Sequence, residues 1–101
     1  MARNISYFSH FFITYDIADP KRLNQVAKII KKYLNRRERS VYDGNLSPAR
    51  LKQLKKEIEN VIEKTEDHCT IIPLTELCRR NIQIIGKPLF DYSTNASSKI
   101  I

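Results

Sequence analysis

The 101-residue chain carries 18 Lys and Arg against 11 Asp and Glu, a net charge of +7, and 42% of its residues are hydrophobic. This length suits one domain over residues 1–101 and is too short for two separate cores. The positive surplus favours nucleic acid as partner. A membrane is disfavoured because the sequence has no apolar run of about 18 residues and no export signal. We therefore expect a cytoplasmic protein.

The first predicted element is a strand at residues 8–17, where aromatic and β-branched residues are concentrated. Its apolar residues occupy both alternating sets of positions, which is typical of a strand covered on both faces. Asp16 lies at its carboxyl end, where the chain leaves the predicted sheet. One interpretation is a turn residue that accepts hydrogen bonds from local amides. The other is a carboxylate that a two-fold axis brings beside its copy, with a cation such as Mg²⁺ between the two.

Two helices are predicted, and each is opened by a capping side chain followed by proline, at Asp19-Pro20 and Ser47-Pro48. Apolar residues recur at helical spacing over residues 23–34 and again over 51–62. Basic residues, Lys21 and Arg22 among them, occupy the remaining faces of the first helix. Both helices are expected to pack one face on a sheet and to expose a basic surface.

Three further strands are predicted at residues 36–43, 68–74 and 82–85, with a turn at Gly44-Asn45 and a short helical turn at 77–80. Residues 87–101 are a tail rich in Ser and Asn, whose end, Ile100-Ile101, is a candidate edge strand for the chain's own sheet or a partner's. The elements fit an α+β fold, the ferredoxin-like βαββαβ sandwich.

In such a sandwich two helices cover one face of the sheet. The apolar pattern of the first strand requires cover for the other face as well, and the remaining chain is too short to provide it. A second copy is the economical cover, because two-fold dimers are the commonest oligomers. We therefore expect a homodimer packed through the sheet faces.

Arg36, Arg37 and Arg39 cluster on the second predicted strand, where alternation would place Arg37 and Arg39 on one face. One interpretation is a charged edge that discourages strand pairing with other chains. The interpretation we favour is a ridge that contacts phosphates together with Lys21 and Arg22. Such contacts would follow the nucleic-acid backbone without reading bases.

The two histidines, His10 and His68, have no nucleophile or pair of carboxylates near them in the sequence, apart from the single Asp67 beside His68. General acid–base chemistry requires such partners within hydrogen-bonding reach. We therefore expect neither histidine to be catalytic.

Several segments together resemble the CRISPR-associated Cas2 family in order and spacing: Tyr15-Asp16-Ile17, Asp19-Pro20-Lys21-Arg22-Leu23, residues 36–43, and Asp67 leading into Ile71-Ile72-Pro73-Leu74. The resemblance runs over residues 11–101. It implies a ferredoxin-like homodimer that bridges dimers of the CRISPR integrase subunit and holds duplex DNA during spacer acquisition in antiviral defence. The family is also described as a Mg²⁺-dependent nuclease, and by position its catalytic aspartate and metal ligand is Asp16.

Three functions therefore remain open. The first is a DNA-binding scaffold for spacer acquisition, and the second is a Mg²⁺-dependent endonuclease or endoribonuclease that uses Asp16 from both protomers. The third is a ferredoxin-like protein that prefers RNA to duplex DNA. Asp16→Ala separates the first two, because a scaffold keeps its binding whereas a nuclease loses cleavage. The chain also lacks the glycine and glutamine that family members often carry around the second strand.

Overall fold

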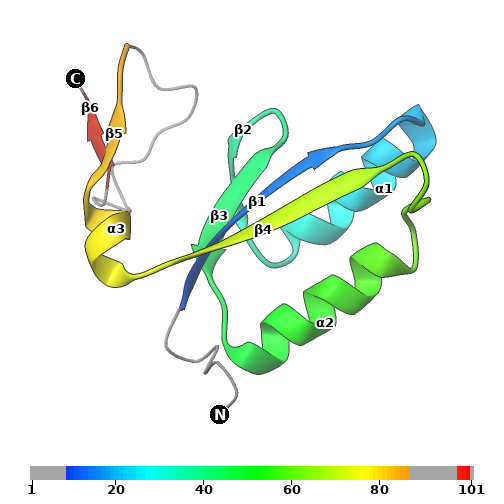
Figure 1. Ribbon diagram of the computed structural model, residues 1–101, viewed down its shortest axis with the longest axis horizontal. Helices are drawn as coiled ribbons and strands as arrows, with labels where there is room; N and C mark the ends of the chain where they lie inside the picture. Colours follow the sequence, from blue (N-terminus) through cyan, green and yellow to red (C-terminus); the bar gives the residue numbers. More distant parts are fainter. Residues whose placement is uncertain (1–8, 87–97, 101) are drawn as a thin grey trace.

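A computed structural model describes residues 9–86 and 98–100 and shows a mixed α+β architecture (Figure 1). Four antiparallel strands form the main sheet in the order β2-β3-β1-β4. Their bounds are β1 His10–Asp16, β2 Asn35–Glu38, β3 Val41–Asn45 and β4 His68–Leu74. The long first strand lies inside the sheet and pairs with β3 as far as Thr14, while its last residue, Asp16, pairs with β4.

The helices α1 (Pro20–Lys31) and α2 (Pro48–Glu59) both lie on the same side of the main sheet (Figure 1). The caps predicted from the sequence are present. The Asp19 carboxylate accepts a hydrogen bond from the backbone N–H of Arg22, and the Ser47 hydroxyl caps α2 in the same way. The two helix starts are therefore set by interactions within three residues along the chain.

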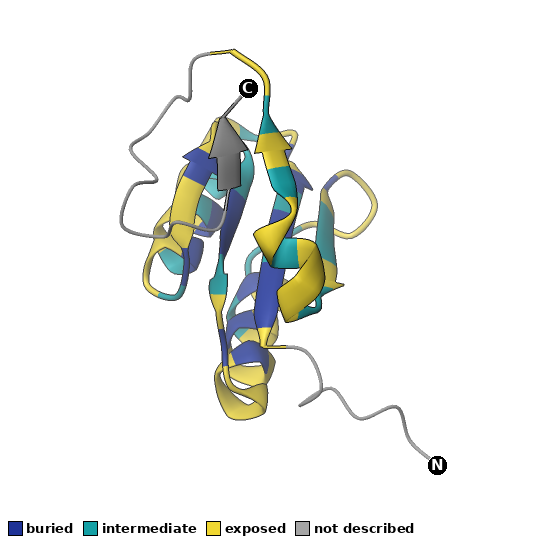
Figure 2. Cartoon of the chain, turned by 90° about the vertical axis from the view of Figure 1, so that its left-hand side faces the viewer, coloured by how far each residue is buried: buried dark blue, intermediate teal, exposed yellow. Residues whose placement is uncertain are grey.

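The core lies between these helices and the sheet. Phe11 and Ile13 of β1 are almost fully buried there, as are Val26 and Ile30 of α1 and Leu54 of α2. Figure 2 shows the buried residues concentrated on the strands and on the helix sides that face them. Burial of each such side chain contributes about 1.5–3 kcal/mol. Odd-numbered residues of β1 thus face the helices, and the even-numbered residues face the other side of the sheet.

The segment predicted as one strand at residues 36–43 is instead a hairpin of β2 and β3, with its turn at Arg39 and Ser40. Gly44 lies within β3 and not in a turn. A Cβ at Gly44 would come within 3.0 Å of Leu34 Cδ2, so glycine allows the chain leaving α1 to pack closely on the strand. This hairpin supplies the two strands that complete the βαββ part of the order.

Beyond β4 the chain forms α3 (Glu76–Arg80) and β5 (Ile82–Ile84), and β5 pairs in parallel with β6 (Ser98–Ile100). The strand predicted at 82–85 therefore belongs to a separate two-stranded sheet and does not join the main one. Residues 87–97 and 101 of the predicted tail lie outside the described residues. That the tail pairs with a partner's sheet stays a prediction.

The two long helices, α1 and α2, have 12 residues each. A transmembrane helix needs about 20 predominantly apolar residues. In the part of the chain that the structure describes, no helix is long and apolar enough to cross a membrane. The cytoplasmic location stays a prediction.

Candidate functional site

Asp16 is the last residue of β1 and is exposed. The antiparallel pairing of β1 with β4 places it directly opposite His68, which is also exposed. Directly paired residues share a face, so both side chains lie on the side of the sheet turned away from the helices. No ion pair between described residues involves Asp16. A carboxylate and an imidazole thus share an open surface at the end of two strands.

In the sequence the only carboxylate singled out near His68 was Asp67, but the fold also gives it Asp16 as cross-strand neighbour. Its Nε2 also lies 2.6 Å from Oγ1 of Thr70 on the same strand. Asp16 and His68 are far apart in the sequence, so no local motif contains the pair. Pairing the two predicted strands in antiparallel register would have found it.

Metal binding at Asp16 would need ligands beyond those that the described part of one protomer brings together. Within residues 9–86, no group of three or more His, Cys, Asp or Glu side chains is placed to hold a metal ion. Mg²⁺ commonly takes one or two protein carboxylates and fills its other positions with water or phosphate oxygens. Two copies of Asp16 would suit that requirement. The Mg²⁺ site and the catalytic role of Asp16 stay predictions.

The loop that follows Asp16 is held in place by Asp67, whose side chain is fully shielded from solvent. The Asp67 carboxylate accepts hydrogen bonds from the backbone N–H groups of Ala18, at 3.0 Å, and Glu63, at 2.8 Å. It also accepts two from the Arg22 guanidinium, at 2.8 and 3.1 Å. The Arg22 hydrogen bonds hold the pKa of the Asp67 carboxyl well below its usual range. Asp67 thereby ties the end of β1 to the segment that leads into β4.

The five basic residues predicted to contact nucleic acid fall into two groups. Arg22 and Arg37 donate to carboxylates of the chain itself. Lys21, Arg36 and Arg39 are exposed. Because a phosphate would have to displace a buried carboxylate from Arg22 or Arg37, only the second group is well placed for contact with a backbone.

Arg37 is buried, donates to the Asp43 carboxylate at 3.0 Å, and lies over the Phe12 ring. Nε2 of His10 lies 2.8 Å from the same Asp43 oxygen. Burial alone would raise the pKa of Asp43, but the hydrogen bonds with His10 and Arg37 outweigh it and lower the pKa. We expected Arg37 and Arg39 to share a face. The strand register shifts between residues 36 and 38 and Arg39 lies in the turn, so the two arginines are separated.

Three cations, Lys31, Arg36 and Arg39, line one pocket of about 340 Å³ between α1 and the β2–β3 hairpin. We call these three residues the cation cluster. The other lining residues are Tyr15, Leu23, Asn24, Ala27, Ser40 and Tyr42. None of the nine is acidic, so the pocket has a single sign of charge. From the sequence, Lys31 is one of several basic residues on the exposed faces of the first helix. It joins Arg36 and Arg39 because the hairpin lies against α1 in the folded chain.

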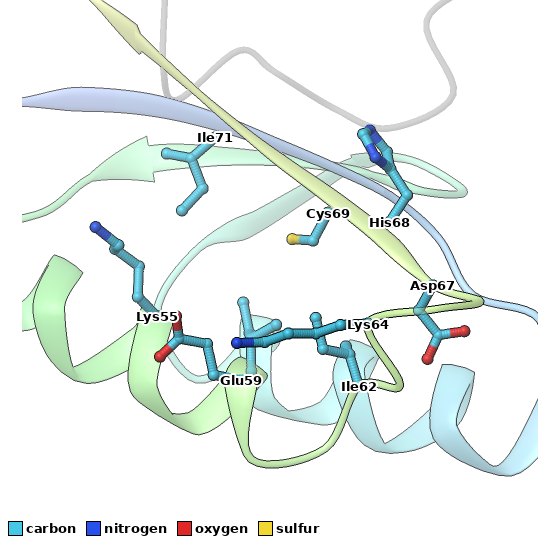
Figure 3. A pocket seen from close by; sticks show the side chains of 9 residues that line it. Lys55, Glu59, Ile62, Lys64, Asp67, His68, Cys69 and Ile71 are labelled. Atoms are coloured by element: carbon cyan, nitrogen blue, oxygen red, sulfur yellow. The ribbon is translucent and has the colours of Figure 1, made fainter.

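A second pocket, also of about 340 Å³, lies between α2 and β4 and differs in its charge. Figure 3 shows Lys55 and Lys64 around this pocket together with the carboxylate of Glu59. That carboxylate repels an anion and competes for the lysines. The pocket of the cation cluster is therefore the better candidate for binding phosphate.

Sequence and structure comparisons identify relatives of this chain in one family. The sequence profile described as "CRISPR associated protein Cas2" matches residues 9–82. The CRISPR-associated endoribonuclease Cas2 3 of Thermodesulfovibrio yellowstonii is 41% identical over 58 residues, which are 57% of this chain and 65% of that protein. The CRISPR-associated endoribonuclease Cas2 of Thermotoga maritima is 30% identical over 77 residues, 76% of this chain and 87% of that protein. The crystal structure of Streptococcus pyogenes Cas2 at pH 6.5 gives a TM-score of 0.69 at 27% identity, covering 76% of this chain and 99% of that chain.

Proposed function

Because the chain belongs to the CRISPR-associated protein Cas2 family, we propose that it binds duplex DNA by the phosphate backbone as a subunit for CRISPR spacer acquisition. In this proposal two copies form a ferredoxin-like homodimer through their sheet faces. The dimer then scaffolds the dimers of the integrase subunit on the DNA. The family membership supports a role in CRISPR defence, and the features below support the DNA contact and the dimer.

The observation that carries the DNA contact is the cation cluster. Lys31, Arg36 and Arg39 are exposed and converge on one pocket whose lining has no acidic residue. Guanidinium groups match the geometry of phosphate oxygens, and each contact releases counterions from the duplex. The exposed Lys21 at the start of α1 and the net charge of +7 add long-range attraction.

Support for the dimer comes from the sheet face opposite the helices. Phe12 of β1 and Ile72 of β4 are paired directly on this face, and Ile72 is 41% exposed. Covering this apolar pair with a second copy would remove it from water. If the two-fold axis of this dimer runs near β1, it would bring the two Asp16 carboxylates toward each other.

The test is the affinity of the full chain for a fluorescein-labelled DNA duplex over a range of salt concentrations, beside a single-stranded RNA of equal length. We expect tight duplex binding that weakens steeply with salt, and Asp16→Ala should retain it. Binding that prefers the RNA, or that requires Asp16, would contradict the scaffold. Light scattering of the same samples gives the oligomeric state, and a monomer at all concentrations would contradict the dimer.

A metal-dependent nuclease is the second candidate, favoured by the Asp16–His68 pair and by the names of the relatives. Asp16 of each protomer would hold Mg²⁺, and the bound ion would supply a water activated for attack on a phosphodiester. His68 is placed to exchange a proton with a group bound beside Asp16.

This candidate is tested by cleavage of labelled RNA and DNA with Mg²⁺ or with a chelator. Asp16→Asn should abolish cleavage while leaving duplex affinity and thermal stability unchanged. His68→Gln should slow cleavage and alter its pH dependence. Cleavage that persists in Asp16→Asn would show that another group, or a contaminant, is responsible.

A further inference from the structure

The pocket of the cation cluster has an apolar wall as well as a charged one. Leu23 and Ala27 of α1 form one side. The rings of Tyr15 and Tyr42, with centroids 6.1 Å apart and planes 23° from parallel, lie beneath the pocket on the sheet side, where they are buried in the core. A backbone phosphate by itself would use only the cations. The apolar wall suits a ligand that has a flat apolar part next to its anionic group.

The hydroxyl groups in this pocket do not oppose an anion. Burial, with the hydrogen bond to Tyr42 as the next cause, raises the pKa of Tyr15 to about 12. Tyr15 is therefore neutral at physiological pH, and its hydroxyl donates to the carbonyl oxygen of Arg39 at 3.4 Å. Ser40 and Asn24 add further polar groups to the lining.

Lys31 and Arg39 of the pocket differ from the nearby Lys32 in their ion pairs. Lys32, next to Lys31 in the sequence, is paired with Glu57 at 2.6 Å. Among the described residues, neither Lys31 nor Arg39 forms an ion pair with a carboxylate. An incoming phosphate thus would not have to displace an acidic side chain from either residue.

We propose that this pocket binds a nucleoside monophosphate unit, with its phosphate on the cation cluster and its nucleoside against Leu23 and Ala27. The volume of about 340 Å³ lies within the usual range of ligand pockets. A terminal phosphate monoester carries a charge of about −1.5 to −2 at neutral pH, more than a backbone diester. The cluster therefore favours a phosphorylated strand end or a free mononucleotide over an internal phosphate. This inference deepens the proposed function and rests on it for the nature of the ligand.

The first experiment titrates the full chain with adenosine monophosphate and, as control, with uncharged adenosine, by isothermal calorimetry. A parallel series compares duplexes that carry a 5′-phosphate or a 5′-hydroxyl and a fluorescent label at the far end. We expect adenosine monophosphate to bind at least tenfold more tightly than adenosine. A comparable gain from the 5′-phosphate assigns the pocket to strand ends, and no gain assigns it to free nucleotides. If adenosine monophosphate does not bind and the two duplexes bind equally well, the proposal is overturned.

Variants then locate the site. Ala27→Phe fills the pocket without changing the charge, so it should abolish binding of adenosine monophosphate. Lys28→Ala removes a charge from the same helix outside the pocket lining and should leave nucleotide binding unchanged. Nucleotide binding that survives in a folded Ala27→Phe protein overturns the assignment.

If Ala27→Phe does not fold, Lys31→Ala combined with Arg39→Ala replaces it, since both side chains are exposed and their loss should not affect the melting temperature. The double variant should lose binding of adenosine monophosphate, and unchanged binding overturns the proposal. Different results would contradict the proposed function and the nucleotide pocket. The proposed function fails when the wild-type chain shows no salt-dependent duplex binding, whereas the pocket fails when duplex binding persists without any effect of a terminal phosphate or a mononucleotide.

Discussion

Two groups of basic side chains in this protein share a residue type and differ in their environment. Arg22 and Arg37 donate to the shielded carboxylates of Asp67 and Asp43, while Arg39 and the rest of the cation cluster are exposed around one pocket. Removing one partner of a buried ion pair leaves the other charge buried without a partner, which is costly. These two arginines therefore have a structural role. The exposed cations can change partners at little cost. Burial thus separates structural arginines from those available to an anion.

The largest expected effect on stability comes from removing the carboxylate that Arg37 and His10 share. Asp43→Ala leaves Arg37 and His10 without their shared carboxylate, and we expect the free energy of unfolding to fall by about 3 kcal/mol. Urea denaturation followed by circular dichroism measures it. Glu59→Ala, an exposed site, is the matched control and should stay within about 0.5 kcal/mol of wild type. Equal effects of the two changes would refute the distinction by burial.

Acid should weaken the ion pair between Arg22 and Asp67, because it protonates the Asp67 carboxylate. Its pKa is lowered in the folded chain relative to the ordinary value of 3.8, so its contribution is present above about pH 4 and is lost as pH falls toward the folded pKa. Asp67→Asn should therefore be much less stable than wild type at pH 7, and the difference should shrink below about pH 4. Thermal melts of both proteins at several pH values measure this. A difference that does not change with pH would mean that the charge of Asp67 plays no part.

A paired substitution compares one arginine from each group. Arg22→Gln should lower the melting temperature, because Asp67 loses two hydrogen bonds, and should leave the salt dependence of duplex binding unchanged. Arg39→Gln should do the reverse, keeping the melting temperature and reducing the slope of log affinity against log salt by about 1. Melting curves and salt titrations on the same preparations give both quantities. If Arg22→Gln reduces the slope as much as Arg39→Gln does, both arginines contact phosphate.

The smallest effect is expected from an exposed ion pair. Lys32 lies 2.6 Å from Glu57, and the Lys32 side chain is 59% exposed. Solvent screens such pairs, so Lys32→Ala should leave the melting temperature unchanged within error. A loss as large as that of Asp43→Ala would show that short distance, and not burial, determines the contribution of an ion pair in this protein.

Much of the architecture could be predicted from the sequence because its signals are local. The caps at Asp19 and Ser47 each act on an amide three residues away, and helical periodicity marked the faces that are buried. The family resemblance was confirmed by the match over residues 9–82. The hairpin was missed because Gly44 and Asn45 look like a turn, whereas both pair with β1 in the folded chain, Gly44 opposite Phe11 and Asn45 opposite His10.

By itself, then, the sequence determined the helix starts, the α+β class, the basic character and the Cas2 family membership. Tertiary structure alone decided which basic residues are exposed and which neighbours the candidate residues have. Arg37 was separated from Arg39, Lys31 joined the cation cluster, and Asp16 came to face His68. The physical reason is that capping and periodicity act within a few residues, while burial and strand register arise from contacts between segments far apart in the chain.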